Sequence, residues 1–169
     1  MLTCCNSVWA YDIEIDGIYY NILSDADKTV EVTYEGSSYT QFSNEYAGNV
    51  TIPNTVDYNG SIYNVISVCE CAFYGCIELI EIHIPSSITS IGDYAFTATD
   101  WNGIIPDGVT SIGFSAFSCC DSLTSVTIPD SVTYIGNYAF KGATVLTNIT
   151  MSNQITTIGN YAFYQYNSL

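Results

Sequence analysis

The sequence predicts a β-rich solenoid whose coils are repeats of about 23 residues, and two observations lead to this prediction. The first is a phrase of the type Ile-Gly-x-x-Ala-Phe. Its Phe recurs at spacings of 23, 21, 23 and 23 residues, at Phe73, Phe96, Phe117, Phe140 and Phe163. The second is a Val-x-Ile alternation that precedes a proline in most copies. A fixed period of this length indicates stacked repeats, because each repeat buries its apolar side chains only against its neighbours.

Each part of the repeat has an expected structure. In Ser125-Val126-Thr127-Ile128 the alternation predicts a short strand whose second and fourth side chains point inward. Pro129 then ends the strand, because proline has no N–H for a ladder. We expect the Gly of each phrase to take a tight or left-handed conformation. The Ala-Phe pair that follows is expected on a short helical or 3₁₀ turn, with Phe at the centre of the coil.

The string Leu123–Phe140 resembles the BspA-type leucine-rich repeat, and the resemblance covers residues 47–169 with five copies in register. It implies a right-handed leucine-rich-repeat solenoid with strands along one side. It also implies a surface or secreted protein of the kind found in Bacteroidetes, with a role in adhesion to host matrix proteins. The copy at Gly103-Ile104-Ile105-Pro106 departs from the pattern because it is two residues short. Trp101 or Ile104 is expected to fill the gap.

The N-terminal part differs from the repeats. Residues 1–10 fit the tail of a signal peptide, since Val8-x-Ala10 follows the small-residue cleavage pattern. Residues 11–46 alternate around Asp16-Gly17, which predicts a hairpin within an antiparallel meander of three strands. We expect this meander to cap the first coil, because terminal repeats must present a polar outer face.

Residues 47–169 form about five repeats, with an inserted hairpin near residues 57–65 around Asn59-Gly60. Leu169 stands where the next strand would begin, so we expect an array truncated at its C-terminus.

The charge of the chain excludes several functions. There are 17 acidic and 2 basic residues, for a formal net charge of −15. Nucleic acids and anionic membrane surfaces are excluded as partners, because both are bound through Lys and Arg. No apolar stretch has the length of a membrane-spanning helix, so this part of the protein is not expected to be inserted in a membrane. The acidity keeps an aromatic-rich chain in solution.

The sequence holds no pattern for catalysis, for a cofactor or for a metal. His83 is the only His, and the strand pattern turns it outward, away from the cysteines of the turns. Cys69-x-Cys71 lacks the partners of a zinc site. Cys76 and Cys120 align with small buried residues two coils apart, about 10 Å at the usual strand spacing, which is too far for a disulfide. We therefore expect neither an enzyme nor a site for a small-molecule substrate.

The expected function is a non-enzymatic secreted or cell-surface module that binds macromolecules outside the cell. The outward strand positions would form its binding surface: Thr51, Glu81, His83, Ser125, Thr127, Asn148 and Thr150. An extracellular protein, from host matrix or from a cell surface, is the expected partner. The set lacks clustered Trp, Tyr and Arg, which suits a weak multivalent contact.

Two alternatives remain open. One is a structural stalk that displays another domain. The other is carbohydrate binding, with Tyr58 and Tyr63 exposed and stacking on sugar rings. Glycans attached at the sequons of Asn49, Asn59 and Asn148 would apply only to a eukaryotic secreted protein.

Overall fold

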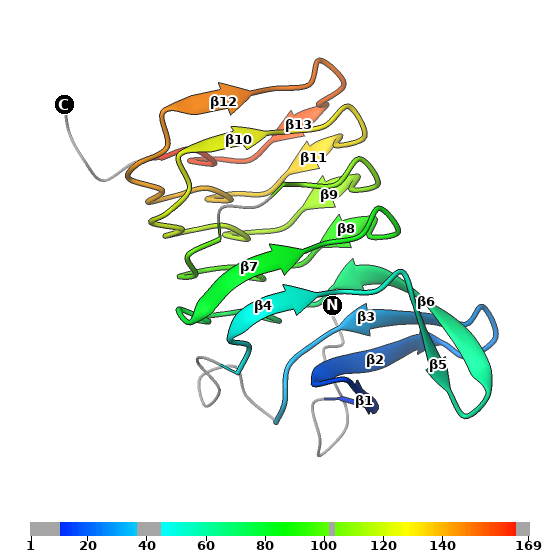
Figure 1. The fold of residues 1–169 in the computed structure, drawn as a ribbon. Coiled ribbons are helices and arrows are strands. Elements are labelled where there is room, and N and C mark those ends of the chain that lie inside the picture. Colours follow the sequence, from blue (N-terminus) through cyan, green and yellow to red (C-terminus); the bar gives the residue numbers. More distant parts are fainter. Residues whose placement is uncertain (1–10, 37–44, 102–103, 165–169) are drawn as a thin grey trace.

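The computed structural model describes residues 11–36, 45–101 and 104–164, and the regular secondary structure of these residues is entirely β-strand. The coils stack one on another, and a twisted sheet lies at the N-terminal end of the stack (Figure 1). The predicted signal-peptide remnant, residues 1–10, lies outside the described residues.

The N-terminal strands form an antiparallel meander that continues into the coils. The strands are β1 (Ile13–Ile15), β2 (Ile18–Ser24) and β3 (Thr29–Val32). A hairpin follows, made of β5 (Thr55–Tyr58) and β6 (Ser61–Val68). Its turn is formed by Asn59 and Gly60, both with positive φ, as an Asn-Gly hairpin turn requires. Because β3 pairs parallel with β6, the meander and the coils share one sheet.

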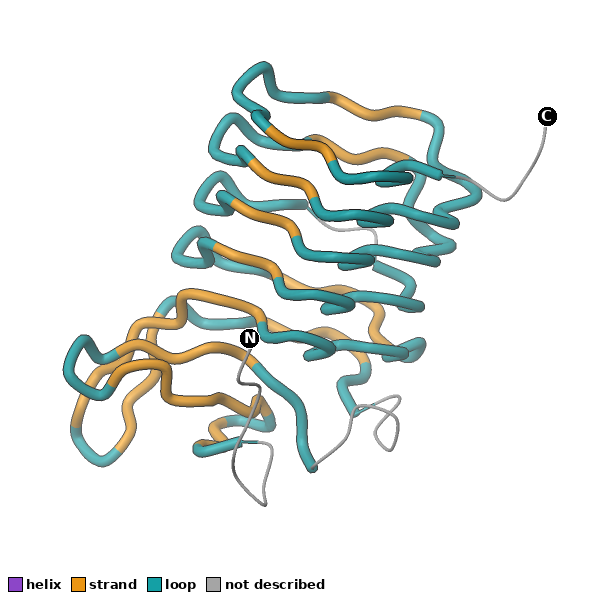
Figure 2. The backbone as a smooth tube through the Cα atoms, turned by 180° about the vertical axis from the view of Figure 1, so that it is seen from behind, coloured by secondary structure: helices purple, strands orange, loops and turns teal. Residues whose placement is uncertain are grey.

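That shared sheet runs the length of the described coils and has nine strands. Beyond β6 its strands are only two residues long: β8 (Ser90–Ile91), β9 (Ser111–Ile112), β11 (Tyr134–Ile135) and β13 (Thr157–Ile158). Neighbouring strands pair in parallel register, so that the Ile before each phrase Gly lies beside its equivalent in the next coil. Figure 2 shows this ladder from behind. The sequence analysis did not predict it, because two residues cannot display an alternation.

The predicted Val-x-Ile strands form the opposite side of the coils. They are β4 (Gly48–Thr51), β7 (Leu79–His83), β10 (Ser125–Thr127) and β12 (Asn148–Thr150). They pair in parallel as β4 with β7 and β10 with β12. In β10, Val126 is buried while Ser125 and Thr127 are exposed, as the alternation predicts. No strand within the described residues joins β7 to β10, so this side of the solenoid is interrupted.

The prediction of a helical or 3₁₀ turn at the Ala-Phe pair is wrong for the described residues. Alternate N–H groups of this segment donate to the next coil instead: Ser115 to the carbonyl of Asn137 (2.9 Å) and Phe117 to that of Ala139 (2.7 Å). Ser118, between two such donors, bonds within its own coil, to the carbonyl of Ser115 (3.0 Å). Ser115 has a left-handed φ of 51°, which a continuing right-handed helix does not permit.

The phrase glycine is also needed for a different reason from the one predicted. A Cβ on Gly136 would lie 2.5 Å from the carbonyl carbon of Gly113 and 2.7 Å from the nitrogen of Phe114, both in the neighbouring coil. The left-handed φ falls two residues later, at Tyr138 (60°). The glycine therefore permits close contact between coils and does not supply a left-handed turn.

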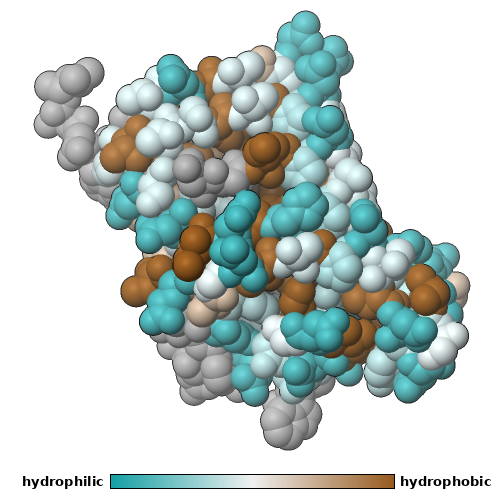
Figure 3. Space-filling view, viewed as in Figure 1, coloured by the Kyte–Doolittle hydropathy of each residue, from teal (hydrophilic) through white to brown (hydrophobic). Residues whose placement is uncertain are grey.

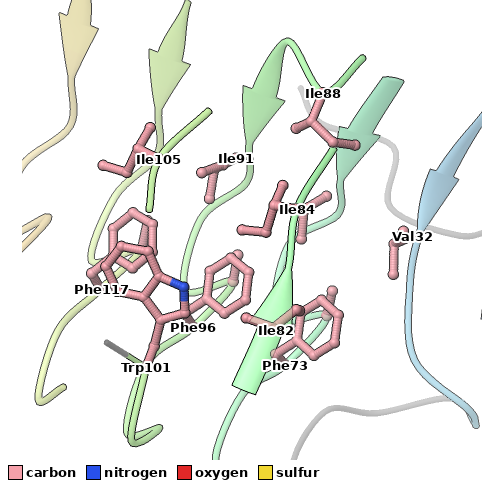
Figure 4. Close-up of a cluster of buried hydrophobic side chains, with 14 of the residues drawn as sticks. Val32, Phe73, Ile82, Ile84, Ile88, Ile91, Phe96, Trp101, Ile105 and Phe117 are labelled. Carbon is pink, nitrogen blue, oxygen red and sulfur yellow. The ribbon is translucent and has the colours of Figure 1, made fainter. Parts of the chain in front are cut away.

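A column of stacked Phe rings fills the centre of the coils. The five phrase Phe rings follow one another at centroid distances of 5.0, 5.3, 5.2 and 5.1 Å and are nearly parallel. Tyr46 packs on the first ring, Phe73, at 4.6 Å. Figure 4 shows part of this column beside the inward Ile side chains. Burial of each such ring stabilises the stack by roughly 1.5–3 kcal/mol. Cys76 and Cys120 are buried, belong to no disulfide, and pack as small apolar residues.

Candidate functional site

The surface formed by β4, β7, β10 and β12 is here called the strand face. All seven residues predicted to form the binding surface are exposed on it. The interruption after β7 divides them into two groups. One group belongs to β4 and β7 (Thr51, Glu81, His83), and the other belongs to β10 and β12 (Ser125, Thr127, Asn148, Thr150).

Within each group the strand register places side chains directly beside one another. Thr51 pairs with His83 across β4 and β7. Ser125 pairs with Asn148, and Thr127 with Thr150, across β10 and β12. Neighbouring strands lie about 4.8 Å apart, so equivalent side chains form short lines that run along the solenoid axis. A flat partner can touch several of these side chains at once.

The interruption results from the short coil that follows Phe96. Trp101 is buried, 2% exposed, and packs on Phe117 with a ring-centroid distance of 4.4 Å. Ile104, the other residue considered for filling the gap, is 82% exposed. Trp101 therefore occupies the space in the coil interior that the inward side chains of a regular strand would occupy. The backbone of this coil does not pair with β7 in the described part of the chain.

A groove of about 730 Å³ lies at the interruption. It runs along β7 and is closed on its other side by the short coil; none of its lining residues comes from β10. The lining residues that matter most are Ile80, Glu81, Ile82, His83, Trp101 and Ile104. Figure 3 shows hydrophobic side chains next to hydrophilic ones over this part of the strand face. The groove itself was not predicted, although the missing two residues of the short repeat are a signal for it.

The described residues show no arrangement for catalysis on the strand face. His83 lies opposite Thr51, and the described cysteines lie in the turns or at their edges. Burial raises the pKa of the Cys120 thiol to about 12, which keeps it protonated and unreactive. Across the described ranges, no group of three or more His, Cys, Asp or Glu side chains could hold a metal ion. Nor does this part of the chain hold a helix long and apolar enough to cross a membrane.

Of the two tyrosines considered for carbohydrate binding, Tyr58 is partly buried and Tyr63 is not available to a sugar. Tyr63 is 4% exposed, and its hydroxyl is hydrogen-bonded to Asp25 and to the ammonium of Lys28. The same ammonium lies 4.8 Å from the centre of the Tyr63 ring. These hydrogen bonds, from Lys28 first and then from Tyr63, lower the pKa of Asp25. The ring is engaged within the protein and has no free face for a sugar, so this prediction is wrong for Tyr63.

Comparison with protein families gives one match. Residues 38–169 match a family described as a BspA type leucine rich repeat region, in six copies. The match begins before residue 47, where the sequence analysis placed the first repeat. A comparison with curated proteins gave no match.

Solved structures with a similar fold come from several bacteria. A leucine-rich repeat protein from Bacteroides ovatus is 31% identical with a TM-score of 0.63, over 90% of this chain and 44% of that one. The pneumococcal vaccine antigen PcpA is 26% identical with a TM-score of 0.70, over 89% and 41%. A leucine-rich repeat protein from Bacteroides capillosus is 24% identical with a TM-score of 0.64, over 87% and 100%. The chain spans less than half the length of the first two proteins.

Proposed function

This chain belongs to the BspA-type leucine-rich repeat family, and on that premise we propose that it is a non-enzymatic, secreted or cell-surface module that binds extracellular proteins through the strand face. The observation that carries the proposal is the alignment of exposed polar side chains across two pairs of neighbouring strands, β4 with β7 and β10 with β12, on one side of a closely packed stack. Repeat proteins use such extended surfaces to bind large partners.

The composition of the strand face favours a broad contact over a deep one. Its exposed residues on β10 and β12 are Ser, Thr and Asn, which offer hydrogen bonds, together with one apolar side chain, Ile149, that is 40% exposed. A single array of this kind binds weakly, and several arrays on one surface multiply the strength of binding. This behaviour suits adhesion to matrix proteins, which present many copies of one site.

A location outside the cell is supported by one of the similar proteins. PcpA is a vaccine antigen, a use that suits a protein exposed to antibodies. The proposed partners of this chain are accordingly proteins of the host matrix or of other cell surfaces.

The test is binding of the chain to immobilised matrix proteins, measured by surface plasmon resonance. The double variant Thr127→Arg, Thr150→Arg places two bulky cations on the strand face at positions that lie side by side. We expect it to weaken binding at least tenfold, about 1.4 kcal/mol or more. The control Thr157→Arg changes an exposed residue of β13 on the opposite side and should bind like the unmodified chain.

Two results would count against the proposal. Equal loss in the strand-face variant and in the β13 control would mean that charge alone, and not the strand face, governs binding. Failure of the unmodified chain to bind any matrix protein would favour the alternative function, a stalk that displays another domain.

A further inference from the structure

We propose that the groove along β7 binds an extended, positively charged peptide segment of a protein partner, which adds to the free edge of β7 as a further strand. This inference rests on the proposed function and names the kind of segment that the strand face would recognise. Four features of the groove carry it: an unpaired strand edge, a buried N–H group without an acceptor, two exposed isoleucines and one acidic side chain without a basic one.

The first feature is the free edge of β7. The N–H of Ile52 donates to the carbonyl of His83 (3.0 Å), so the peptide groups of His83 face β4. In an extended strand the groups of the next residue point the other way, and those of Ile82 therefore face the groove. In the part of the chain that the structure describes, no backbone group bonds to this edge. An unpaired edge is a template for another strand.

The second feature is the indole N–H of Trp101. It is buried at the groove, and no acceptor for it lies among the described residues. Figure 4 shows the indole against Phe117, with its nitrogen on the side of the Phe96 ring, beyond which Ile82 and β7 lie. Leaving a buried donor unpaired costs about 1–3 kcal/mol, which a carbonyl of an added strand would regain.

The third feature is apolar. Ile104 and Ile80 are the two most exposed large hydrophobic side chains of the described residues, at 82% and 80%, and both line the groove. Exposed apolar side chains gathered at one groove mark an interaction site. They suit apolar side chains at alternate positions of a strand, since successive side chains of a strand point to opposite faces.

The fourth feature is charge. Glu81 lines the groove and no Lys or Arg does. The two basic residues of the chain are engaged elsewhere: Lys28 forms an ion pair with Asp25 (2.7 Å), and Lys141 lies over the ring of Tyr138. With a net charge of −15, the protein attracts cationic segments over a long range. The peptide is therefore expected to alternate basic and apolar residues.

The probe is a blocked peptide of alternating lysine and valine, as long as β7 and labelled with fluorescein. Its affinity for the chain is measured by fluorescence anisotropy. Binding at the groove is followed separately through tryptophan emission in the variant Trp9→Phe, which leaves Trp101 as the only Trp. We expect saturable binding and a change in the emission of Trp101.

Three comparisons separate strand addition from simple charge attraction. Glu81→Lys should weaken binding about tenfold, whereas Glu14→Lys, the same change of charge at an exposed residue of β1, should weaken it less than about twofold. Methylating the valine nitrogens of the peptide removes its donors and should weaken binding about tenfold. Trp101→Phe keeps an aromatic ring but removes the N–H, and should weaken binding about fivefold.

The inference is overturned if the methylated peptide binds as tightly as the parent, or if Glu81→Lys and Glu14→Lys weaken binding equally. It is also overturned if the emission of Trp101 does not change. Loss of matrix binding in Thr127→Arg, Thr150→Arg without any peptide binding would refute the groove and leave the proposed function standing. Peptide binding without matrix binding would support the groove and refute the proposed function.

Discussion

Replacing Gly136 by Ala tests the way in which the coils are held together. The added Cβ would lie 2.5 to 2.7 Å from three backbone atoms of Gly113 and Phe114. None of these atoms belongs to a flexible side chain. The neighbouring coil must therefore move by about 0.9 Å before the closest contact reaches the 3.4 Å of ordinary packing.

The magnitude follows from the bonds that this movement stretches. The N–H of Gly136 donates to the carbonyl of Ile112 at 2.8 Å, and the N–H of Ser115 donates to that of Asn137 at 2.9 Å. Lengthening both by most of an ångström removes two backbone hydrogen bonds, each worth about 1 kcal/mol. Overpacking adds about 1–3 kcal/mol. We expect Gly136→Ala to lower the free energy of unfolding by about 3–5 kcal/mol.

Urea denaturation followed by circular dichroism measures this loss. The control is Gly48→Ala, because Gly48 has a positive φ of 68° and nothing within 4 Å of an added Cβ. That substitution should cost only the left-handed strain of about 1–2 kcal/mol. If Gly136→Ala were no more destabilising than Gly48→Ala, close contact between coils would not be the reason for the glycine.

Three further predictions concern the core, the cap and the turns. Phe117→Ala should lower the free energy of unfolding by about 3–5 kcal/mol and Phe163→Ala by about half as much, in the same urea assay. Phe117 is fully buried between two rings, whereas Phe163 is partly exposed and stacks on one described ring. Equal losses would contradict the stack. Burial first, and then the charge of Glu35, raise the pKa of Glu45 from 4.5 to about 7. A raised carboxyl pKa stabilises the fold at low pH, and this stability is lost as the pH rises from about 4.5 through 7. The melting temperature should therefore fall more between pH 5 and pH 8 in the unmodified chain than in Glu45→Gln; parallel curves would refute this. Iodoacetamide at pH 8 should modify exposed Cys119 and spare buried Cys120, as peptide mass spectrometry can show. Equal labelling would contradict the burial of Cys120.

The repeated features of the fold could be predicted from the sequence because the same residue pattern recurs in several repeats. The period of the phrase Phe identified stacked coils, and the alternation around Val126 identified the outer strands with the correct inward side. The same alternation placed His83 and Thr127 outward, where the structure has them. A pattern that recurs at a fixed period can be recognised even when each copy is short.

The features that were missed depend on contacts between coils. A strand of two residues such as Ser111–Ile112 has no period of its own, and only its neighbours make it a strand. The left-handed residues Tyr138 and Ser115 give no compositional signal, since neither is Gly or Asn. The groove beside β7 arises where one repeat departs from the others, so its shape depends on how Trp101 fills that coil.

Hydrogen–deuterium exchange of the chain with a bound matrix protein tests the central claim most directly, because it locates the contact without any substitution. The account predicts slower exchange in the segments 79–84, 125–127 and 148–150, which form the strand face on both sides of the interruption. It predicts no change at 111–112 and 134–135, in the sheet on the opposite side. Protection confined to the nine-stranded sheet, with the strand face exchanging as in the free chain, would contradict the account.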